Sequence, residues 1–130
     1  MDQTKTKSDG NGSGTIFIVD DEPLLLDLAT EILQPLGYDV RTFVNPEVAL
    51  AEFIALKPAV VVTDYAMQEM SGIDLIRECK RLNPRPKFML VSGAVEENVY
   101  ADSAAKPDIF LGKPYHFQEL IDSVQKLAAS

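Results

Sequence analysis

Acidic side chains follow two apolar runs of the sequence, at the point where each run ends. Asp20, Asp21 and Glu22 come directly after the run 15–19, and Asp64 ends the run 59–64. Crowded carboxylates repel one another, so a positive charge has to lie among them. Oxygen ligands suit a hard cation such as Mg²⁺. The acids therefore predict a divalent metal site.

A hydroxyl and an ammonium group stand at the ends of two further apolar runs. Ser92 follows residues 87–91, and Lys113 follows residues 109–112. Taken singly, such a serine can be an ordinary turn residue, and a lysine before a proline can be an exposed charge. Because the carboxyl ends of parallel strands meet at one edge of a sheet, the four strand-end positions together favour one shared site.

The elements that would position these residues can be read from the apolar pattern. β-Branched and aromatic residues fill most of the runs without alternation, which is typical of strands buried on both faces of a parallel sheet. Strands are expected at 15–19, 38–43, 59–64, 87–91 and 109–112. Helices, with apolar residues at helical spacing, are expected at 23–34, 46–57, 73–82, 96–103 and 116–128. A strand followed by a helix, five times, predicts a doubly wound α/β sandwich around a five-stranded parallel sheet.

Length and composition set limits on the class of protein. We expect a disordered polar tail at 1–14 and one domain at 15–130. No apolar run approaches the roughly 18–20 residues of a membrane span, and the N-terminus lacks the apolar segment of a signal peptide, so we expect a cytoplasmic protein. The net charge of −8 argues against a nucleic-acid-binding surface. The single cysteine, Cys79, is expected to be a small buried hydrophobe.

Five separated pieces of the chain, in this order, resemble the receiver domain of two-component response regulators. The resemblance extends over about residues 15–128. The pieces are Val19-Asp20-Asp21-Glu22-Pro23, Val62-Thr63-Asp64, Met70-Ser71-Gly72, Val91-Ser92-Gly93 and Lys113-Pro114-Tyr115.

The resemblance implies a flavodoxin-like fold and a phosphorylation site. Asp64 matches the phosphoacceptor, which takes a phosphoryl group from a histidine kinase. Asp21 and Asp64 match direct ligands of Mg²⁺ (or Mn²⁺), with Asp20 acting mainly through water and the backbone carbonyl of Ala66 as a further ligand. These assignments agree with the chemistry of phosphoryl transfer, in which catalysis is mostly positioning and electrostatics.

The same resemblance implies roles for four residues on the later strands. Ser92 matches the hydroxyl that binds the phosphoryl group, and Lys113 matches the lysine that pairs with it. Pro114 matches a cis proline. Phe110 matches an aromatic switch that swings inward when Ser92 moves, and the output would appear on the face formed by the fourth helix, the last strand and the last helix.

The leading interpretation is a stand-alone phosphoaspartate switch, which phosphorylates itself and turns over no external substrate. Its expected partner is a sensor histidine kinase or phosphotransfer protein, with no nucleic acid and no membrane, and it would be a monomer or a phosphorylation-dependent dimer. A receiver fragment of a hybrid histidine kinase or phosphorelay stays open. A Mg²⁺-dependent phosphohydrolase usually has Asp-x-Asp after the strand, and Asp64-Tyr65-Ala66 lacks the second acid. A flavin binder would bring a phosphate against Asp20–Glu22, which would repel it.

Overall fold

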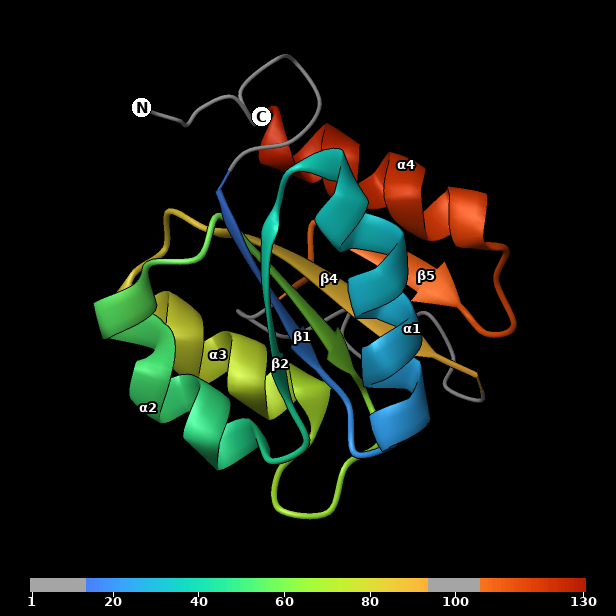
Figure 1. Ribbon diagram of the computed structural model, residues 1–130. Helices are drawn as coiled ribbons and strands as arrows, with labels where there is room; N and C mark the ends of the chain where they lie inside the picture. The colour runs from blue at the N-terminus through green and yellow to red at the C-terminus, as the bar shows by residue number, and fades with distance from the viewer. Residues whose placement is uncertain (1–13, 94–105) are drawn as a thin grey trace.

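A five-stranded parallel sheet forms the centre of the molecule (Figure 1). The computed structural model describes residues 14–93 and 106–130. The strand order is β2-β1-β3-β4-β5, and every neighbouring pair is parallel. The predicted flavodoxin-like sheet is thereby confirmed. The strands are β1 (Thr15–Val19), β2 (Asp39–Phe43), β3 (Val60–Asp64), β4 (Lys87–Ser92) and β5 (Ile109–Gly112).

Helices cover both faces of the sheet. They are α1 (Pro23–Leu33), α2 (Pro46–Leu56), α3 (Gly72–Leu82) and α4 (Phe117–Ala128). Figure 1 shows α1 and α4 on one face and α2 and α3 on the other. The helix expected at 96–103 lies outside the described residues, so α4 is the helix expected at 116–128. None of the helices in the described ranges has the length and hydropathy to pass through a lipid bilayer.

Two hydrophobic cores result from the alternation of side chains along the buried strands. Ile16 and Ile18 of β1 point toward α1 and α4, whereas Phe17 and Val19 point toward α2 and α3. All four side chains are buried, and each contributes about 1.5–3 kcal/mol by leaving water. Cys79 lies in the second core, and burial raises the pKa of its thiol to about 12. The expectation of a small buried hydrophobe at this position is confirmed.

Local signals fix where the helices begin. The Asn45 side chain accepts a hydrogen bond from Glu47 N at 2.8 Å before the first-turn proline of α2. Ser71 Oγ accepts one from Asp74 N at 3.1 Å at the start of α3. These caps satisfy backbone N–H groups in the first turns of both helices, which follow the carboxyl ends of β2 and β3.

Most predicted elements differ from the observed ones by one residue at one end, and two of these differences have a clear physical cause. The chain tightens into a 3₁₀ turn over Gln34–Leu36 after α1, since Pro35 has no N–H for an α-helical bond and Gly37 then takes a φ of 105°. Tyr38 precedes β2 instead of opening it. Its ring is buried in the core beneath α1 and α4, with 4% of the residue exposed.

Candidate functional site

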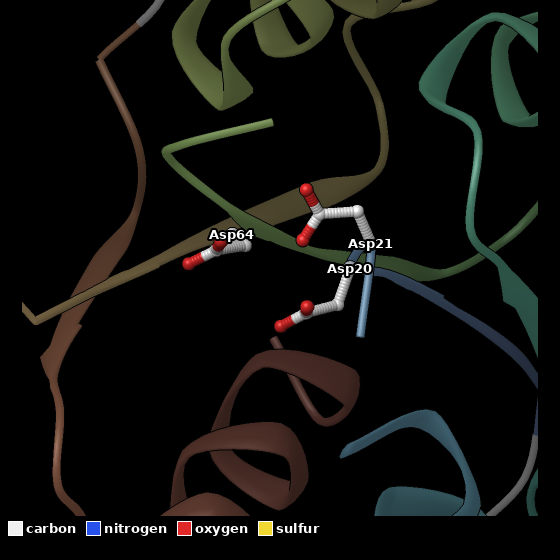
Figure 2. Close-up of side chains that lie close together, drawn as sticks. All are labelled: Asp20, Asp21 and Asp64. Carbon is white, nitrogen blue, oxygen red and sulfur yellow. The ribbon is translucent and has the colours of Figure 1, made fainter. Parts of the chain in front are cut away.

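Three carboxyl groups meet at the carboxyl edge of the sheet (Figure 2). Asp20 and Asp21 directly follow β1, and Asp64 ends β3. Because β1 and β3 are paired neighbours, with Val19 opposite Thr63, their carboxyl ends lie side by side. One oxygen from each carboxylate lies within 4.8 Å of the others, a spacing at which all three could bind one divalent cation.

Lys113 brings a positive charge to this cluster from the loop after β5. Its Nζ lies 3.2 Å from Asp64 Oδ1 and 3.5 Å from Asp20 Oδ2. Asp20 and Asp64 are 7% and 9% exposed, whereas Asp21 is exposed. Residues from three strands, far apart in the sequence, therefore converge on one partly buried site, with Asp21 at its solvent side.

The electrostatics of the site favour a further cation. Burial raises the pKa of the Asp64 carboxyl, repulsion from Asp20 raises it further, and the Lys113 ammonium only partly offsets the two. For Lys113, burial lowers the pKa, but Asp20 and Asp64 together raise it above its ordinary value. Three carboxylates against one ammonium leave an excess of negative charge, and oxygen ligands of this type suit Mg²⁺.

Backbone hydrogen bonds hold the acids in place. Asp20 Oδ1 accepts a bond from Glu22 N at 2.9 Å, which fixes the carboxylate at the start of α1. Thr63 Oγ1 donates to Asp64 O at 3.0 Å, and Gly72 N donates to Tyr65 O at 2.8 Å. The loop after β3 is thereby tied to the first turn of α3. The site is thus preorganised by its own backbone.

The other predicted site residues lie near the acids at different depths. Ser92 ends β4 and is 6% exposed, and its carbonyl accepts from Lys113 N at 2.9 Å. Phe110 of β5 is partly buried against the core beneath α2 and α3. Ala66 is exposed in the loop after β3, and the Lys113–Pro114 peptide bond is cis. The roles of these four residues stay predictions.

Sequence reasoning missed the position of Tyr115. Its partly buried ring lines a cavity of about 20 Å³ together with Asp20 and Asp64, and burial raises the pKa of its phenol. It also lines a groove of about 480 Å³ between α1 and α4. Its place two residues after Lys113 was the one available signal, but the depth of its ring depends on the packing of α1 against α4.

The flavodoxin-like sheet, with acids at the ends of β1 and β3 and a lysine after β5 at one site, defines the class of α/β domain. Comparison with known proteins identifies the family. The family model described as "Response regulator receiver domain" matches residues 16–125. The chain therefore belongs to the receiver domain family of two-component response regulators. This membership does not favour the Mg²⁺-dependent phosphohydrolase.

Relatives of different lengths are similar to this chain. The transcriptional regulatory protein TdiR of Thauera aromatica is 34% identical over 99% of this chain and 56% of TdiR. The chemotaxis protein CheY of Thermotoga maritima is 27% identical over 87% of this chain and 96% of CheY. The chain thus spans about half of TdiR and nearly all of CheY.

A solved structure gives a third comparison. The response regulator protein TrrA of Thermotoga maritima, solved in complex with Mg²⁺-BeF, superposes with a TM-score of 0.76 at 30% identity. The match covers 87% of this chain and 97% of TrrA.

Proposed function

We propose that this receiver domain is phosphorylated on Asp64 by the phosphohistidine of a sensor histidine kinase or phosphotransfer protein. The observation that carries the proposal is the Asp64 carboxylate, which lies 3.2 Å from the Lys113 ammonium and within the cluster of three acids. An Asp64 oxygen attacks phosphorus, the P–N bond breaks, and its electron pair stays with the imidazole. The product is an acyl phosphate on Asp64.

The surrounding residues supply charge and position. Asp20, Asp21, Asp64 and the Ala66 carbonyl would hold Mg²⁺, which when bound neutralises charge on the transferring phosphoryl oxygens. Lys113 already points at Asp64, so its ammonium can pair with a phosphoryl oxygen without a large movement. Catalysis of this kind needs no proton transfer by the protein, which fits a site built from carboxylates and one ammonium.

The response to phosphorylation begins at Ser92. A phosphoryl group adds about 1.5–2 negative charges and three acceptor oxygens, to which the Ser92 hydroxyl would move. Phe110, two residues before the end of β5, would then fill the space that Ser92 leaves. The expected readout is a population shift on the face made by β5, α4 and the predicted helix at 96–103, the last of which lies outside the described residues.

The apolar groove between α1 and α4 would receive a helix of the phosphodonor protein. It opens beside the phosphoacceptor, because Lys113 and Tyr115 line the groove and also face Asp20 and Asp64. Exposed acids, Asp27 and Glu31 on α1 and Asp122 on α4, give those helices acidic outer faces, which complement a donor helix that carries lysine or arginine.

Phosphorylation can be tested directly with a small phosphodonor. On incubation with Mg²⁺ and acetyl phosphate, intact-mass spectrometry should show a single phosphoryl adduct. The adduct should be absent in Asp64→Asn and present in Asp74→Asn, which removes an exposed aspartate on α3. Formation should stop when a chelator removes the metal. An adduct that persists in Asp64→Asn, or that ignores the chelator, would contradict the proposal.

Three expectations stay predictions of the sequence. They are the boundary between a tail at 1–14 and the domain, the cytoplasmic location, and the stand-alone organisation. Gly14, the last residue of the predicted tail, accepts a hydrogen bond from Asp39 N at 3.0 Å. Size-exclusion chromatography with and without acetyl phosphate would test the expected monomer or phosphorylation-dependent dimer.

A further inference from the structure

A second pocket lies at the edge of the sheet opposite the acids. It has a volume of about 550 Å³ and is lined by Ala59 and Lys87, at the amino ends of β3 and β4, whereas Asp64 and Ser92 end those strands. The connections from α2 to β3 and from α3 to β4, which form most of its wall, lie at the upper left of Figure 1. The C-terminal end of α4 completes it. The pocket is thus separate from the phosphoacceptor site.

Three cations line this pocket without ion-pair partners. Lys57, Arg85 and Lys87 form no ion pair with any residue of the described ranges. Elsewhere on the surface, Arg41 pairs with Asp39 at 3.2 Å and Arg81 with Glu78 at 2.7 Å. No Asp or Glu side chain lines the pocket, although the chain as a whole has a net charge of −8.

The negative ends of nearby helices offset only part of this positive charge. The C-termini of α2, α3 and α4 all lie at the pocket, and each carries about half a negative charge. Together they offset about 1.5 of the three positive charges. Ser130 also lines the pocket, and where the chain ends there its carboxylate offsets one more, which leaves an excess of about 0.5 to 1.5 positive charges. A ligand that binds here should therefore be an anion.

Apolar side chains form the rest of the lining. Ile54 and Leu82 are 51% and 43% exposed, and Leu127 adds a third apolar side chain. Pro58 and Pro86, which also line the pocket, fix φ in the two connecting loops, so the walls are formed before any ligand binds. The pocket thus combines a fixed apolar surface with excess positive charge, and its volume is within the range of about 300–1,000 Å³ that small-molecule sites occupy.

We propose that this pocket binds a small amphiphilic anion, with an aromatic or acyl body against Ile54, Leu82 and Leu127 and a carboxylate or phosphate toward Lys57, Arg85 and Lys87. The site does not share a residue with the acids, so binding is independent of phosphorylation chemistry and is retained in Asp64→Asn. Failure of either proposal leaves the other intact.

Naphthoate is a suitable probe because it joins an aromatic body to one carboxylate. In a titration followed by backbone amide shifts in the ¹⁵N NMR spectrum, saturable changes should centre on residues 54–59 and 82–87. The neutral naphthylmethanol should bind about tenfold more weakly, since it lacks the charge. The double variant Lys57→Gln/Arg85→Gln should weaken naphthoate binding by about tenfold as well.

A matched control removes the same charge elsewhere. Arg41→Gln/Arg77→Gln changes two exposed arginines outside the pocket and should leave the affinity within about twofold. The proposal is overturned if both double variants weaken binding equally, or if the shifts centre on the α1–α4 groove at 25–32 and 113–120. Binding of a glutamate-rich peptide with no binding of naphthoate would also overturn it.

Discussion

Asp64 is the residue on which the proposed chemistry depends, and its environment opposes its own charge. The carboxyl is nearly buried, and its pKa is raised by burial and by Asp20 despite the ammonium of Lys113 at 3.2 Å. A raised pKa means that the ionised form costs folding free energy at neutral pH. The site is therefore held in an unfavourable electrostatic state that a bound cation would relieve.

Replacing this charge should stabilise the metal-free protein. Asp64→Asn keeps the size of the side chain and removes the buried charge, so we expect a higher thermal midpoint at pH 7, measured by circular dichroism in the presence of a chelator. Lys113 keeps Asp20 as a partner at 3.5 Å in this variant. An unchanged or lower midpoint would show that the Lys113–Asp64 pair outweighs the burial of the charge.

Asp74→Asn is a control for which we expect a change in thermal midpoint of the opposite sign. The Arg77 guanidinium, 2.8 Å away, lowers the pKa of the Asp74 carboxyl below its ordinary value. Its contribution to stability is present above this value and is lost as the pH falls through the lowered pKa. Asp74→Asn should therefore have a slightly lower midpoint than wild type at pH 7, and the difference should vanish well below pH 3.8.

At the scale of single elements, the start of α3 fixes the phosphoacceptor strand. An added Cβ on Gly72 would lie 2.3 Å from Asp64 O and 2.8 Å from Leu90 Cδ1. Asp64 O is a backbone atom, so it could move away from the added Cβ only if β3 moved with it. The first turn of α3 thus packs directly on the carbonyl of the proposed phosphoacceptor, and only glycine permits the contact.

Gly72→Ala should therefore destabilise the protein and disturb the site together. We expect a loss of about 1–3 kcal/mol in the free energy of unfolding, measured by urea denaturation, with slower phosphorylation by acetyl phosphate. The matched variant Gly112→Ala, where the nearest atom to the added Cβ is Ser92 O at 3.9 Å, should lose much less. Equal losses in the two variants would argue against a specific contact at Gly72.

Elements with a strong local signal could be predicted from the sequence, and so could the edge at which their ends meet. Buried apolar runs located β1, β3 and β4, and parallel pairing then brought Asp20 and Asp64 to one edge. The burial of Tyr38, the position of Tyr115 and the two large pockets could not be predicted. Each depends on how elements distant in sequence pack together. The spacing of hydrophobic residues along the chain does not determine the space that remains between packed helices.

At the scale of the whole molecule, the net charge and the local acid cluster act on stability in different ways. A net charge of −8 gives general self-repulsion, which any salt screens. The acid cluster adds a local repulsion that Lys113 offsets only in part and that a bound cation would relieve further. Measurements of metal binding therefore have to separate screening from site occupancy.

Mg²⁺ should raise the thermal midpoint more than NaCl does at equal ionic strength. At a concentration tenfold above its dissociation constant, it should add about 1.4 kcal/mol to the free energy of unfolding. Asp21→Asn should abolish the additional effect, and Glu52→Gln, which removes one exposed charge on α2, should retain it. Identical responses to the two salts in wild type would mean that the metal acts by screening alone.

The strand order also has a consequence for how the protein is made. Because the lysine follows β5 whereas the acids lie at the ends of β1 and β3, a chain cut before residue 113 would carry the carboxylates without their ammonium. A product cut before residue 109 would also lack β5, the strand that covers one side of β4. The site therefore gains its ammonium only once the synthesised chain extends past β5.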